Sequence, residues 1–370
     1  MKTVLFLITT LRRTGPVNIL FDLTKYLDRS VYNVHVLTLC AEKGDSRWAE
    51  FEAEGVTVST LDLPKGWRFV IAAPRLRRVT QEIRPDIVHT VGFRSDVLAA
   101  FFLNNFRKVS SQLNYPFDDY VMTYGKKVGG AMAHLTSWAL KRCDVTVACA
   151  SDVATKLARH GVPAKVIYNA VDDARFVPAP PSERAAARAR LGLWNDADIV
   201  FIFVGVLSDR KQPLVTIQAF LQFHEQHPKA ALIVLGDGPL FAACHELAQG
   251  RRVHFAGNVT DTRPYLTASD VYIATSKAEG MPVSVIEALA LRLPVVLSDI
   301  QPHREILAID PGAGRLAQTG SVDGTLKAMR QVANADLSIM GGHARRIVDQ
   351  ELSARVMARK FEVLYGALGR

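Results

Sequence analysis

Residues 199–207 read IVFIFVGVL, an unbroken apolar run of β-branched and aromatic side chains, and residues 208–213 follow it as SDRKQP. An apolar run of this length that ends in turn residues is typical of a strand buried on both faces of a sheet. Further runs of the same kind follow: AALIVLGDG (230–238), RVHFAGNV (252–259), DVYIATS (270–276) and LPVVLSD (293–299). The second half of the chain is therefore predicted to be an α/β domain with a parallel sheet.

The first half repeats the pattern. Its apolar runs are TVLFLIT (3–9), NVHVLTL (33–39), VTVSTLDL (56–63), DIVHTVG (86–92), DVTVACA (144–150) and KVIYNAV (165–171). Stretches with helical spacing lie between them, such as NILFDLTKYLD (18–28) and APRLRRVTQEI (73–83). The segment at 177–198 opens with three prolines and has no strand signal, so we expect a linker followed by one helix.

We therefore predict an α/β protein of two Rossmann-like, doubly wound parallel-sheet domains. The first spans residues 1–175 and the second residues 176–350, with a last helix at about 350–370 that packs back on the first domain. A chain of 370 residues is too long for one ordinary core. Ligands of such sheets bind beyond the carboxyl ends of the strands, so a central cleft that both domains face is the expected site.

The charge indicates which class of partner to expect, and the cysteines indicate the cellular compartment. The net charge is +9, and residues 1–180 hold 24 Lys and Arg against 17 Asp and Glu. A basic half indicates an anionic partner, but the basic residues are scattered in pairs without a nucleic-acid-binding signature, so nucleic acid is not expected. The four cysteines form no C-x-x-C pair, which argues against disulfides and zinc and fits a reducing cytoplasm.

No segment of the sequence predicts a membrane span. The opening MKTVLFLITTLRRTG ends in two arginines without a small-residue cleavage pattern, so we expect a first buried strand and not a signal peptide. No apolar stretch reaches the ~18 residues that a transmembrane helix needs. The predicted location is cytoplasmic, at most peripheral on the inner face of the membrane.

Two pairs of charged residues follow strands of the second half. Arg210 and Lys211 come after IVFIFVGVL, where adjacent cations suit a diphosphate as well as a solvated turn. Glu279 and Glu287 lie in SKAEGMPVSVIEALA (276–290), and Glu287 falls on the apolar stripe of a predicted helix. A buried carboxylate is costly unless it is paired or hydrogen-bonded, so we expect Glu287 to face a polar pocket.

These segments together resemble the retaining GT-B glycosyltransferases of glycosyltransferase family 4. EGMPVSVIEALA (279–290) is similar to the family's E-x7-E region, and FVGVLSDRKQP (203–213) to its strand followed by Arg-Lys. LIVLGDGPL (232–240), VHFAGNV (253–259) and VIYNAVD (166–172) resemble its Gly-Asp-Gly-Pro turn, its base-contacting strand end and its interdomain signature. The resemblance covers nearly the whole chain, and the order of the motifs is more specific than any one of them.

The resemblance implies a nucleotide-sugar donor and assigns roles. Glu287 would hold the ribose hydroxyls, and Glu279 the donor sugar beside the backbone of Gly280, Met281 and Pro282. Arg210 and Lys211 would stabilise the departing nucleoside diphosphate, in place of a metal ion. Asn258 and Val259 would meet the base. The implied reaction is a front-face transfer that retains the anomeric configuration, with no cofactor.

The first half carries further family-like segments. TTLRRTGPVNILFDL (9–23) places Gly15 where the family keeps a glycine-rich loop near the donor, although one glycine stands where the family commonly has two. DIVHTVGFRSD (86–96) places His89 at a strand end, where the resemblance implies contact with donor sugar or acceptor. Arg94 and Asp96 are acceptor-side candidates. A structural histidine at a strand end is the alternative for His89.

The acceptor implied by the resemblance is a glycan or polyprenyl-linked sugar in cell-surface polysaccharide or glycolipid synthesis. The amphipathic segment at 126–142 is compatible with an anionic membrane surface and equally with a core helix.

Asp196 and Asp198 form an Asp-x-Asp in a polar linker, which favours a surface turn over a metal site. The alternatives are a nucleotide-sugar epimerase of the same fold and a non-catalytic sugar-nucleotide-binding subunit. A nicotinamide dehydrogenase is excluded because no G-x-G-x-x-G follows either first strand.

Overall fold

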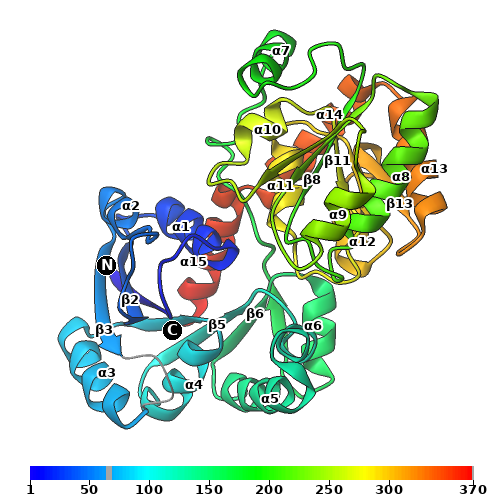
Figure 1. Cartoon of the computed structure of the whole chain (residues 1–370). Helices are drawn as coiled ribbons and strands as arrows, with labels where there is room; N and C mark the ends of the chain where they lie inside the picture. Colours follow the sequence, from blue (N-terminus) through cyan, green and yellow to red (C-terminus); the bar gives the residue numbers. More distant parts are fainter. Residues whose placement is uncertain (64–68, 369–370) are drawn as a thin grey trace. The chain divides into compact units, whose positions relative to one another are not determined.

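The computed structural model describes residues 1–63 and 69–368 of the chain. The chain divides into two compact units (Figure 1). Unit 1 comprises Met1–Ala170 together with Ala354–Arg370, and unit 2 comprises Val171–Ser353.

Unit 1 is built on a seven-stranded parallel sheet with the order β3-β2-β1-β4-β5-β6-β7. The strands are β1 Lys2–Ile8, β2 Tyr32–Cys40, β3 Thr57–Leu63, β4 Ile87–Val91, β5 Arg107–Gln112, β6 Val145–Ala148 and β7 Ala164–Val166. The sheet reverses direction of growth at β1 and β4, which is the doubly wound arrangement. The central strand β1 is buried at Val4, Leu5, Phe6 and Leu7, since helices cover both of its faces.

The helices of unit 1 include α15, which follows unit 2 in the sequence. They are α1 Gly15–Tyr26, α2 Trp48–Ala53, α3 Phe69–Ile83, α4 Phe93–Phe102, α5 Pro116–Leu140, α6 Ser151–Ala158 and α15 Ala354–Leu368. Helix α15, red in Figure 1, packs beside α1. Helix α4 buries Val97 and Ala100 against α5, as a core helix does.

Unit 2 is built on a six-stranded parallel sheet with the order β10-β9-β8-β11-β12-β13. The strands are β8 Val200–Val204, β9 Ala231–Leu235, β10 Val253–Gly257, β11 Val271–Ala274, β12 Val295–Ser298 and β13 Gly314–Ala317. Strands β8 and β11 lie side by side although the chain places two other strands between them. The loops that follow β8 and β11 therefore meet at the carboxyl edge, where doubly wound sheets bind ligands.

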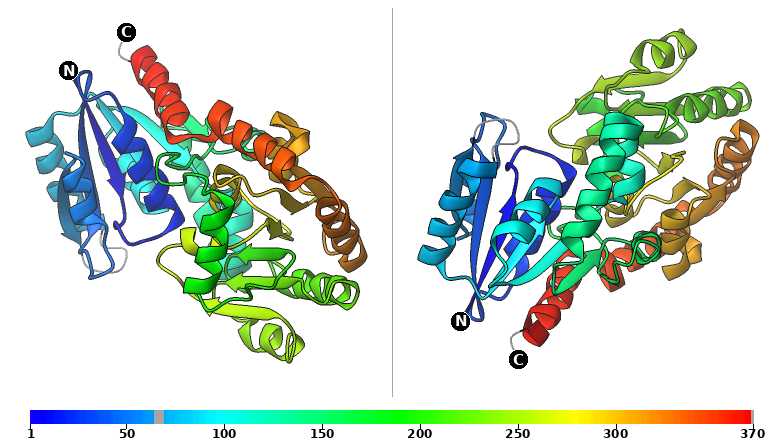
Figure 2. Two further views of the ribbon diagram at one scale, coloured as in Figure 1. Left: turned by 90° about the horizontal axis from the view of Figure 1, so that it is seen from above. Right: turned by 90° about the horizontal axis from the view of Figure 1, so that it is seen from below.

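Helices and short helical turns cover the sheet of unit 2. They are α7 Pro181–Arg190, α8 Pro213–Gln226, α9 Phe241–Leu247, α10 Arg263–Thr267, α11 Val283–Ala290, α12 Gln301–Ile309, η1 Pro311–Ala313, α13 Val322–Ala333, α14 Leu337–Ile347 and η2 Val348–Leu352. Helices α8 and α13, light green and orange, lie side by side in Figures 1 and 2. Both contribute to one apolar core, through Phe220 of α8 and Met329 of α13 among others.

The predicted fold of two doubly wound parallel sheets is confirmed. Two strands were not predicted. Strand β5 reads RKVSSQ and β13 reads GRLA, so neither has the continuous apolar character that the pattern requires. Strand β5 is nevertheless buried along most of its length, because hydrogen bonds satisfy its polar side chains.

The ends of unit 2 lie next to each other. Val171 and Ser353 form a parallel β-bridge, and the Val171 amide donates to the Leu352 carbonyl at 3.1 Å.

In the described part of the chain, no helix is both long enough and apolar enough to cross a bilayer.

Candidate active site

Three of the predicted residues of unit 2 form one ion cluster. Lys211 Nζ lies 2.5 Å from Glu279 Oε1, and Arg210 Nη1 lies 3.0 Å from Glu279 Oε2. The two cations come from the loop after β8 and the carboxylate from the loop after β11. The strand order that places β8 beside β11 thus brings together residues that the sequence separates widely.

The carboxylate at the centre of this cluster is ionised. The Glu279 side chain is only 7% exposed, so burial alone would raise its pKa. Lys211 and Arg210 outweigh this effect and hold the Glu279 pKa at about 2. The cluster therefore carries one net positive charge around neutral pH. Lys211 is 14% exposed and Arg210 is 35% exposed, so Arg210 is the more accessible cation.

Backbone contacts fix the two loops against each other. Arg210 Nη1 donates to the Ala278 carbonyl at 2.9 Å, and the Lys277 amide donates to the Arg210 carbonyl at 2.8 Å. Thr275 Oγ1 donates to the Gln212 carbonyl at 2.8 Å, just before α8 begins. Side chains held in this way lose little further entropy when a ligand binds, so the cluster is preorganised for an anion.

A close backbone approach supports the Arg210 loop from the other side. Gly236 adopts φ +125°, and a Cβ at this position would lie 2.0 Å from the Gly205 carbonyl oxygen. The Leu207 amide donates to the Asp237 carbonyl at 3.0 Å in the same contact. Glycine is therefore required at 236 by both conformation and space. The Gly-Asp-Gly-Pro turn positions the loop that carries Arg210 and Lys211.

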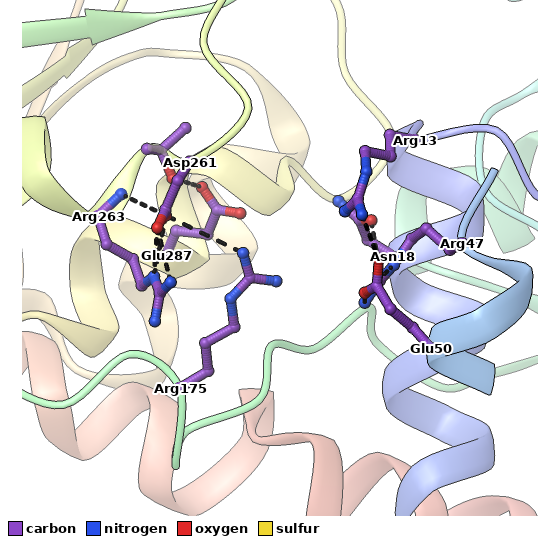
Figure 3. A network of polar contacts seen from close by, with 9 residues as sticks. Arg13, Asn18, Arg47, Glu50, Arg175, Asp261, Arg263 and Glu287 are labelled. Atoms are coloured by element: carbon purple, nitrogen blue, oxygen red, sulfur yellow. Dashed lines mark hydrogen bonds and ion pairs between the residues drawn. The ribbon is translucent and has the colours of Figure 1, made fainter. Parts of the chain in front are cut away.

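Glu287 lies on α11 and is partly buried. Its Oε2 accepts a hydrogen bond from Thr262 Oγ1 at 3.0 Å (Figure 3). Burial raises the Glu287 pKa to about 7, although Thr262 and the positive charge of Arg175 oppose this rise. Glu287 is thus a partly buried carboxyl near its midpoint at neutral pH, a state typical of functional groups.

An ion pair beside Glu287 involves residues that the sequence did not suggest. Arg263 binds Asp261 through both side-chain oxygens, with contacts between 2.6 and 3.0 Å. Arg175 approaches the same carboxylate, with its Nη2 4.0 Å from Asp261 Oδ1 (Figure 3). No local motif marks this group, because Arg175 lies far along the chain from Asp261 and Arg263.

The remaining predicted donor-binding residues of unit 2 lie in the segment before α11 and in the loop after β10. Met281 is 3% exposed, and Pro282 caps the N-terminus of α11 instead of lying inside its first turn. Gly280 is buried between Glu279 and Met281. Asn258 is exposed and Val259 half-buried in the loop after β10. Tyr272 lies within the electrostatic reach of both glutamates, and its hydroxyl donates to Ser284 Oγ at 2.8 Å.

The sequence also did not suggest His303, which interacts electrostatically with Glu279 and Lys211 of the ion cluster. His303 is fully buried at the start of α12, and its Nδ1 lies 2.8 Å from the Ser298 carbonyl. Ser298 Oγ in turn donates to the Ser276 carbonyl at 2.6 Å. Burial lowers the His303 pKa to about 4, so the ring is neutral. This chain of contacts ties α12 to the loop that carries Glu279.

His89 of unit 1 is occupied by structural contacts. Its side chain is 1% exposed; Nδ1 lies 2.6 Å from the Tyr365 hydroxyl of α15 and Nε2 lies 2.7 Å from Ser111 Oγ. The ring also packs between Phe6 and Phe361. Burial lowers the His89 pKa to about 3. These contacts favour the structural alternative for His89, and its catalytic role stays a prediction.

The acceptor-side candidates are also placed differently from the expectation. Asp96 is fully buried and accepts hydrogen bonds from Thr90, Ser110 and Gln112 at 2.5, 2.7 and 3.0 Å. Burial raises the Asp96 pKa to about 6 despite these donors. Contact between Asp96 and an acceptor would break this network, so its geometry favours a structural role. Arg94 is half-buried, with Nη1 3.5 Å from Cys40 Sγ.

Gly15 begins α1 in an exposed position. A Cβ at this position would meet no other atom within 4 Å, so unit 1 itself places no steric demand for glycine there. Arg47, which precedes α2, contacts both helices: its Nη1 donates to Asn18 Oδ1 of α1 at 2.8 Å, and its Nε donates to Glu50 Oε2 of α2 at 2.9 Å (Figure 3). Arg13 pairs with Glu50 as well.

Metal ligands do not gather in the described residues: no group of three or more His, Cys, Asp or Glu side chains could hold an ion there. Asp196 is exposed and pairs with Arg252, which confirms the surface turn expected at Asp196 and Asp198.

Both halves of the chain match models of one enzyme class. Residues 13–175 match the model described as Glycosyltransferase Family 4, and residues 198–335 match Glycosyl transferases group 1. The chain belongs to the family 4 glycosyltransferases. The predicted resemblance to family 4 is thereby confirmed, and the retaining mechanism stays a prediction.

Two relatives illustrate the similarity. An uncharacterized glycosyltransferase of Methanocaldococcus jannaschii is 26% identical over 267 residues, which cover 66% of this chain and 64% of that protein. The matched region thus spans less than two thirds of that relative. The UDP-Gal:alpha-D-GlcNAc-diphosphoundecaprenol alpha-1,3-galactosyltransferase of Escherichia coli is 26% identical, over 93% of this chain and 86% of its own length.

Solved structures share the fold. Anabaena HepE in complex with UDP and glucose superposes with a TM-score of 0.81 at 20% identity, covering 99% of this chain and all of HepE. Sucrose-phosphate synthase of Thermosynechococcus elongatus gives a TM-score of 0.81 at 18% identity and covers 99% of both chains. This family 4 glycosyltransferase therefore has the GT-B fold.

Proposed function

We propose that this protein transfers a sugar from a nucleotide-sugar donor to a glycan or lipid-linked acceptor, in the synthesis of a cell-surface polysaccharide or glycolipid. The observation that carries the proposal is the cluster of Arg210, Lys211 and Glu279 at the carboxyl edge of the unit 2 sheet. The Escherichia coli relative is named for such a reaction, with a UDP-sugar and a lipid diphosphate.

The chemistry of glycosyl transfer suits this cluster. The bond between the anomeric carbon and the diphosphate breaks through an oxocarbenium-like transition state, so negative charge develops on the leaving oxygen. Arg210 and Lys211 supply fixed positive charge for that oxygen, and Glu279 holds both cations in place before the donor arrives. We propose that these cations replace a metal ion and that the transfer retains the anomeric configuration.

Glu287 suits the ribose of the donor. An ionised carboxylate can accept hydrogen bonds from both hydroxyls of a ribose diol, in the manner of acidic residues in other dinucleotide sites. Thr262 already orients its Oε2. The backbone around Gly280–Pro282 lies at the start of α11, where free amides favour sugar oxygens. Asn258 and Val259 would then face the base.

We further propose that unit 1 contacts an anionic membrane surface through the bend in α5. Gly125 breaks this helix with φ +78°. Beside the bend, Met122, Tyr124 and Val128 are 58%, 55% and 58% exposed, and Lys126 and Lys127 are exposed as well. Exposed apolar side chains combined with lysines are typical of segments that lie in a lipid interface. Such contact would place the enzyme at a lipid-linked acceptor, on the cytoplasmic face.

A two-step experiment tests the function. The purified chain is first screened against a panel of nucleotide sugars for protection from thermal unfolding, because a bound donor stabilises the folded state according to its affinity. The protecting donor is then incubated with sugar-diphospho-lipid acceptors, with and without EDTA. We expect an α-linked product from an α-linked donor, formed equally with EDTA. Epimerised donor in the absence of acceptor would identify an epimerase, and no transfer to any acceptor would contradict the proposal.

A further inference from the structure

Arg175 stands on the segment through which the chain enters unit 2, and its backbone is fixed on both sides. The Arg175 amide donates to the Asp172 carbonyl at 3.0 Å, and the Ala174 amide donates to Asp172 Oδ1 at 3.0 Å. The next residue, Phe176, is 4% exposed, and its carbonyl accepts from Arg345 Nη1 at 3.1 Å. Arg175 therefore projects from a rigid turn and not from a free linker.

The ion pair that Arg175 makes does not explain its position. Arg263 already occupies both oxygens of Asp261 with short contacts. Arg175 remains 4.0 Å from Asp261 Oδ1, and its side chain is 36% exposed. A second, longer and partly solvated ion pair to a carboxylate that is already paired adds little stability.

Among the described residues, no cation forms an ion pair with Glu287. Figure 3 shows Arg175 projecting toward the region where Asp261 and Glu287 lie together. Glu287 accepts a hydrogen bond from neutral Thr262 on one side and faces the negative charge of Asp261 on another. Burial and Asp261 both disfavour the charged form of Glu287, whereas the guanidinium of Arg175 favours it.

We propose that Arg175 is a positioning residue that raises the carboxylate fraction of Glu287 and thereby strengthens nucleotide binding at neutral pH. The identity of the ligand rests on the proposed function; the electrostatic coupling of the two side chains does not. A diol donates two hydrogen bonds to a carboxylate, but a protonated carboxyl must use one oxygen as a donor itself. Loss of the Arg175 charge would therefore weaken binding most where Glu287 is partly protonated.

Among the charged groups around Glu287 in the described chain, Arg175 supplies the positive charge that favours the ionised form of Glu287. Tyr272 of β11 is neutral, because burial raises the pKa of its hydroxyl. Strand β12 carries no ionisable side chain. On α14 and η2, Arg345 pairs with Asp349 and donates to the Ala290 carbonyl at 3.0 Å. Arg263 is bound to Asp261.

A double-mutant cycle on the ligand-free protein tests the coupling. The melting temperature is measured at about pH 5 and about pH 8 for the wild type, Arg175→Met, Glu287→Gln and the double variant. Because the folded-state pKa of Glu287 is raised from 4.5 to about 7, stability is lost as pH rises between these two values, and the loss levels off above about pH 7. Arg175→Met should enlarge this loss, lowering the melting temperature by about 2–4 °C more at the higher pH.

Two controls separate coupling from a structural effect. The additional loss at high pH should vanish in the Glu287→Gln background, and Arg175→Lys should behave like the wild type. Arg190→Met removes an exposed cation of the same unit, on α7, and should cause no pH-dependent change. If the loss at high pH persists with Glu287→Gln, or if Arg175→Met shows none, the proposal is wrong.

Binding of a probe nucleotide sugar extends the test. With UDP-glucose, Arg175→Met should bind about as well as the wild type near pH 9, about fivefold more weakly near pH 7 and close to tenfold more weakly near pH 6. A pKa rise of about one unit lowers the ionised fraction of Glu287 at pH 7 from about one half to about one tenth. An equal loss at every pH would show that Arg175 touches the ligand instead and would overturn the proposal. If the wild type binds no nucleotide sugar, the proposed function fails, while the thermal cycle still decides the coupling.

Discussion

Lys211 and Glu279 face each other at 2.5 Å across the carboxyl ends of β8 and β11, two neighbouring strands that are not consecutive in the chain. Arg210 completes the cluster from the same loop as Lys211. Two cations and one carboxylate give the proposed leaving-group site one net positive charge, and each of the three side chains depends on the others for its position.

Replacement of Lys211 should affect turnover more than donor affinity. We expect Lys211→Ala to lower kcat by about 100-fold or more, because it removes a fixed charge from the developing diphosphate. The donor KM should change less. The control is Lys277→Ala in the facing loop, whose exposed side chain pairs with the exposed Asp209 and should leave kcat unchanged. Steady-state kinetics would contradict the assignment if both variants turned over at the wild-type rate.

Replacement of Glu287 should affect donor affinity and its pH dependence. The Glu287 pKa of about 7 means that the carboxylate needed for a diol is lost as pH falls through neutrality. Wild-type affinity for a nucleotide sugar should therefore fall toward tenfold per pH unit below about pH 7. Glu287→Gln should bind weakly at every pH and lose this slope. Calorimetric titration of the donor between about pH 6 and pH 9 measures both, and an unchanged slope in the variant would refute the role.

Two glycines should respond in opposite ways to alanine. Gly236→Ala places a Cβ 2.0 Å from the Gly205 carbonyl oxygen in a left-handed conformation, so we expect lower stability and a large loss of activity through the Lys211 loop. Gly15→Ala meets no atom within 4 Å and should leave the melting temperature of the free protein unchanged. Activity of Gly15→Ala then reports directly on whether the donor approaches this backbone, as the sequence predicts.

The contacts of His89 predict a stability defect. His89→Gln and Tyr365→Phe each leave a buried polar group without its partner, which costs about 1–3 kcal/mol. Both variants should lower the melting temperature and keep kcat within a few-fold of the wild type. Since the His89 pKa is about 3, its ring should not contribute a step to the pH profile near neutrality. A variant that melts normally but loses most of its turnover would restore the catalytic prediction for His89.

The bend in α5 predicts binding to anionic vesicles. The wild type should sediment with vesicles that contain phosphatidylglycerol and not with phosphatidylcholine alone, and salt should release it. Combined Lys126→Glu and Lys127→Glu, or Tyr124→Asp with Val128→Asp, should abolish sedimentation at an unchanged melting temperature, because these side chains are exposed. Sedimentation of both charge variants at the wild-type level would exclude this surface.

The sequence predicted those parts of the molecule that local pattern determines. Continuous apolar strands gave the two sheets, and the strand–loop residues Arg210, Lys211 and Glu279 were expected at one edge, where the structure brings them together. Strand β5 was not predicted because it contains polar residues. Ser110 and Gln112 can be buried there because both donate hydrogen bonds to Asp96, which belongs to α4.

Non-local partners explain the other differences. His89 and Asp96 were expected to face substrates, but Tyr365 binds the first from the far end of the chain and Gln112 the second from β5. No sequence motif indicated Arg175, because its proposed role depends on Glu287 and Asp261, which lie far from it in the sequence and near it in the fold. A motif identifies side chains of suitable chemistry, whereas burial by distant segments decides which of them remain accessible.

The bridge between Val171 and Ser353 makes unit 2 resemble an insertion with its two ends held together. Such a segment can be deleted or replaced, because it is joined to the rest of the chain at two points that lie next to each other. Joining residue 170 to residue 354 by a short glycine linker would leave α15 covalently attached to its sheet. Exchange of unit 2 is expected to change the donor preference, because the proposed donor-binding residues Arg210, Lys211 and Glu287 all lie in it.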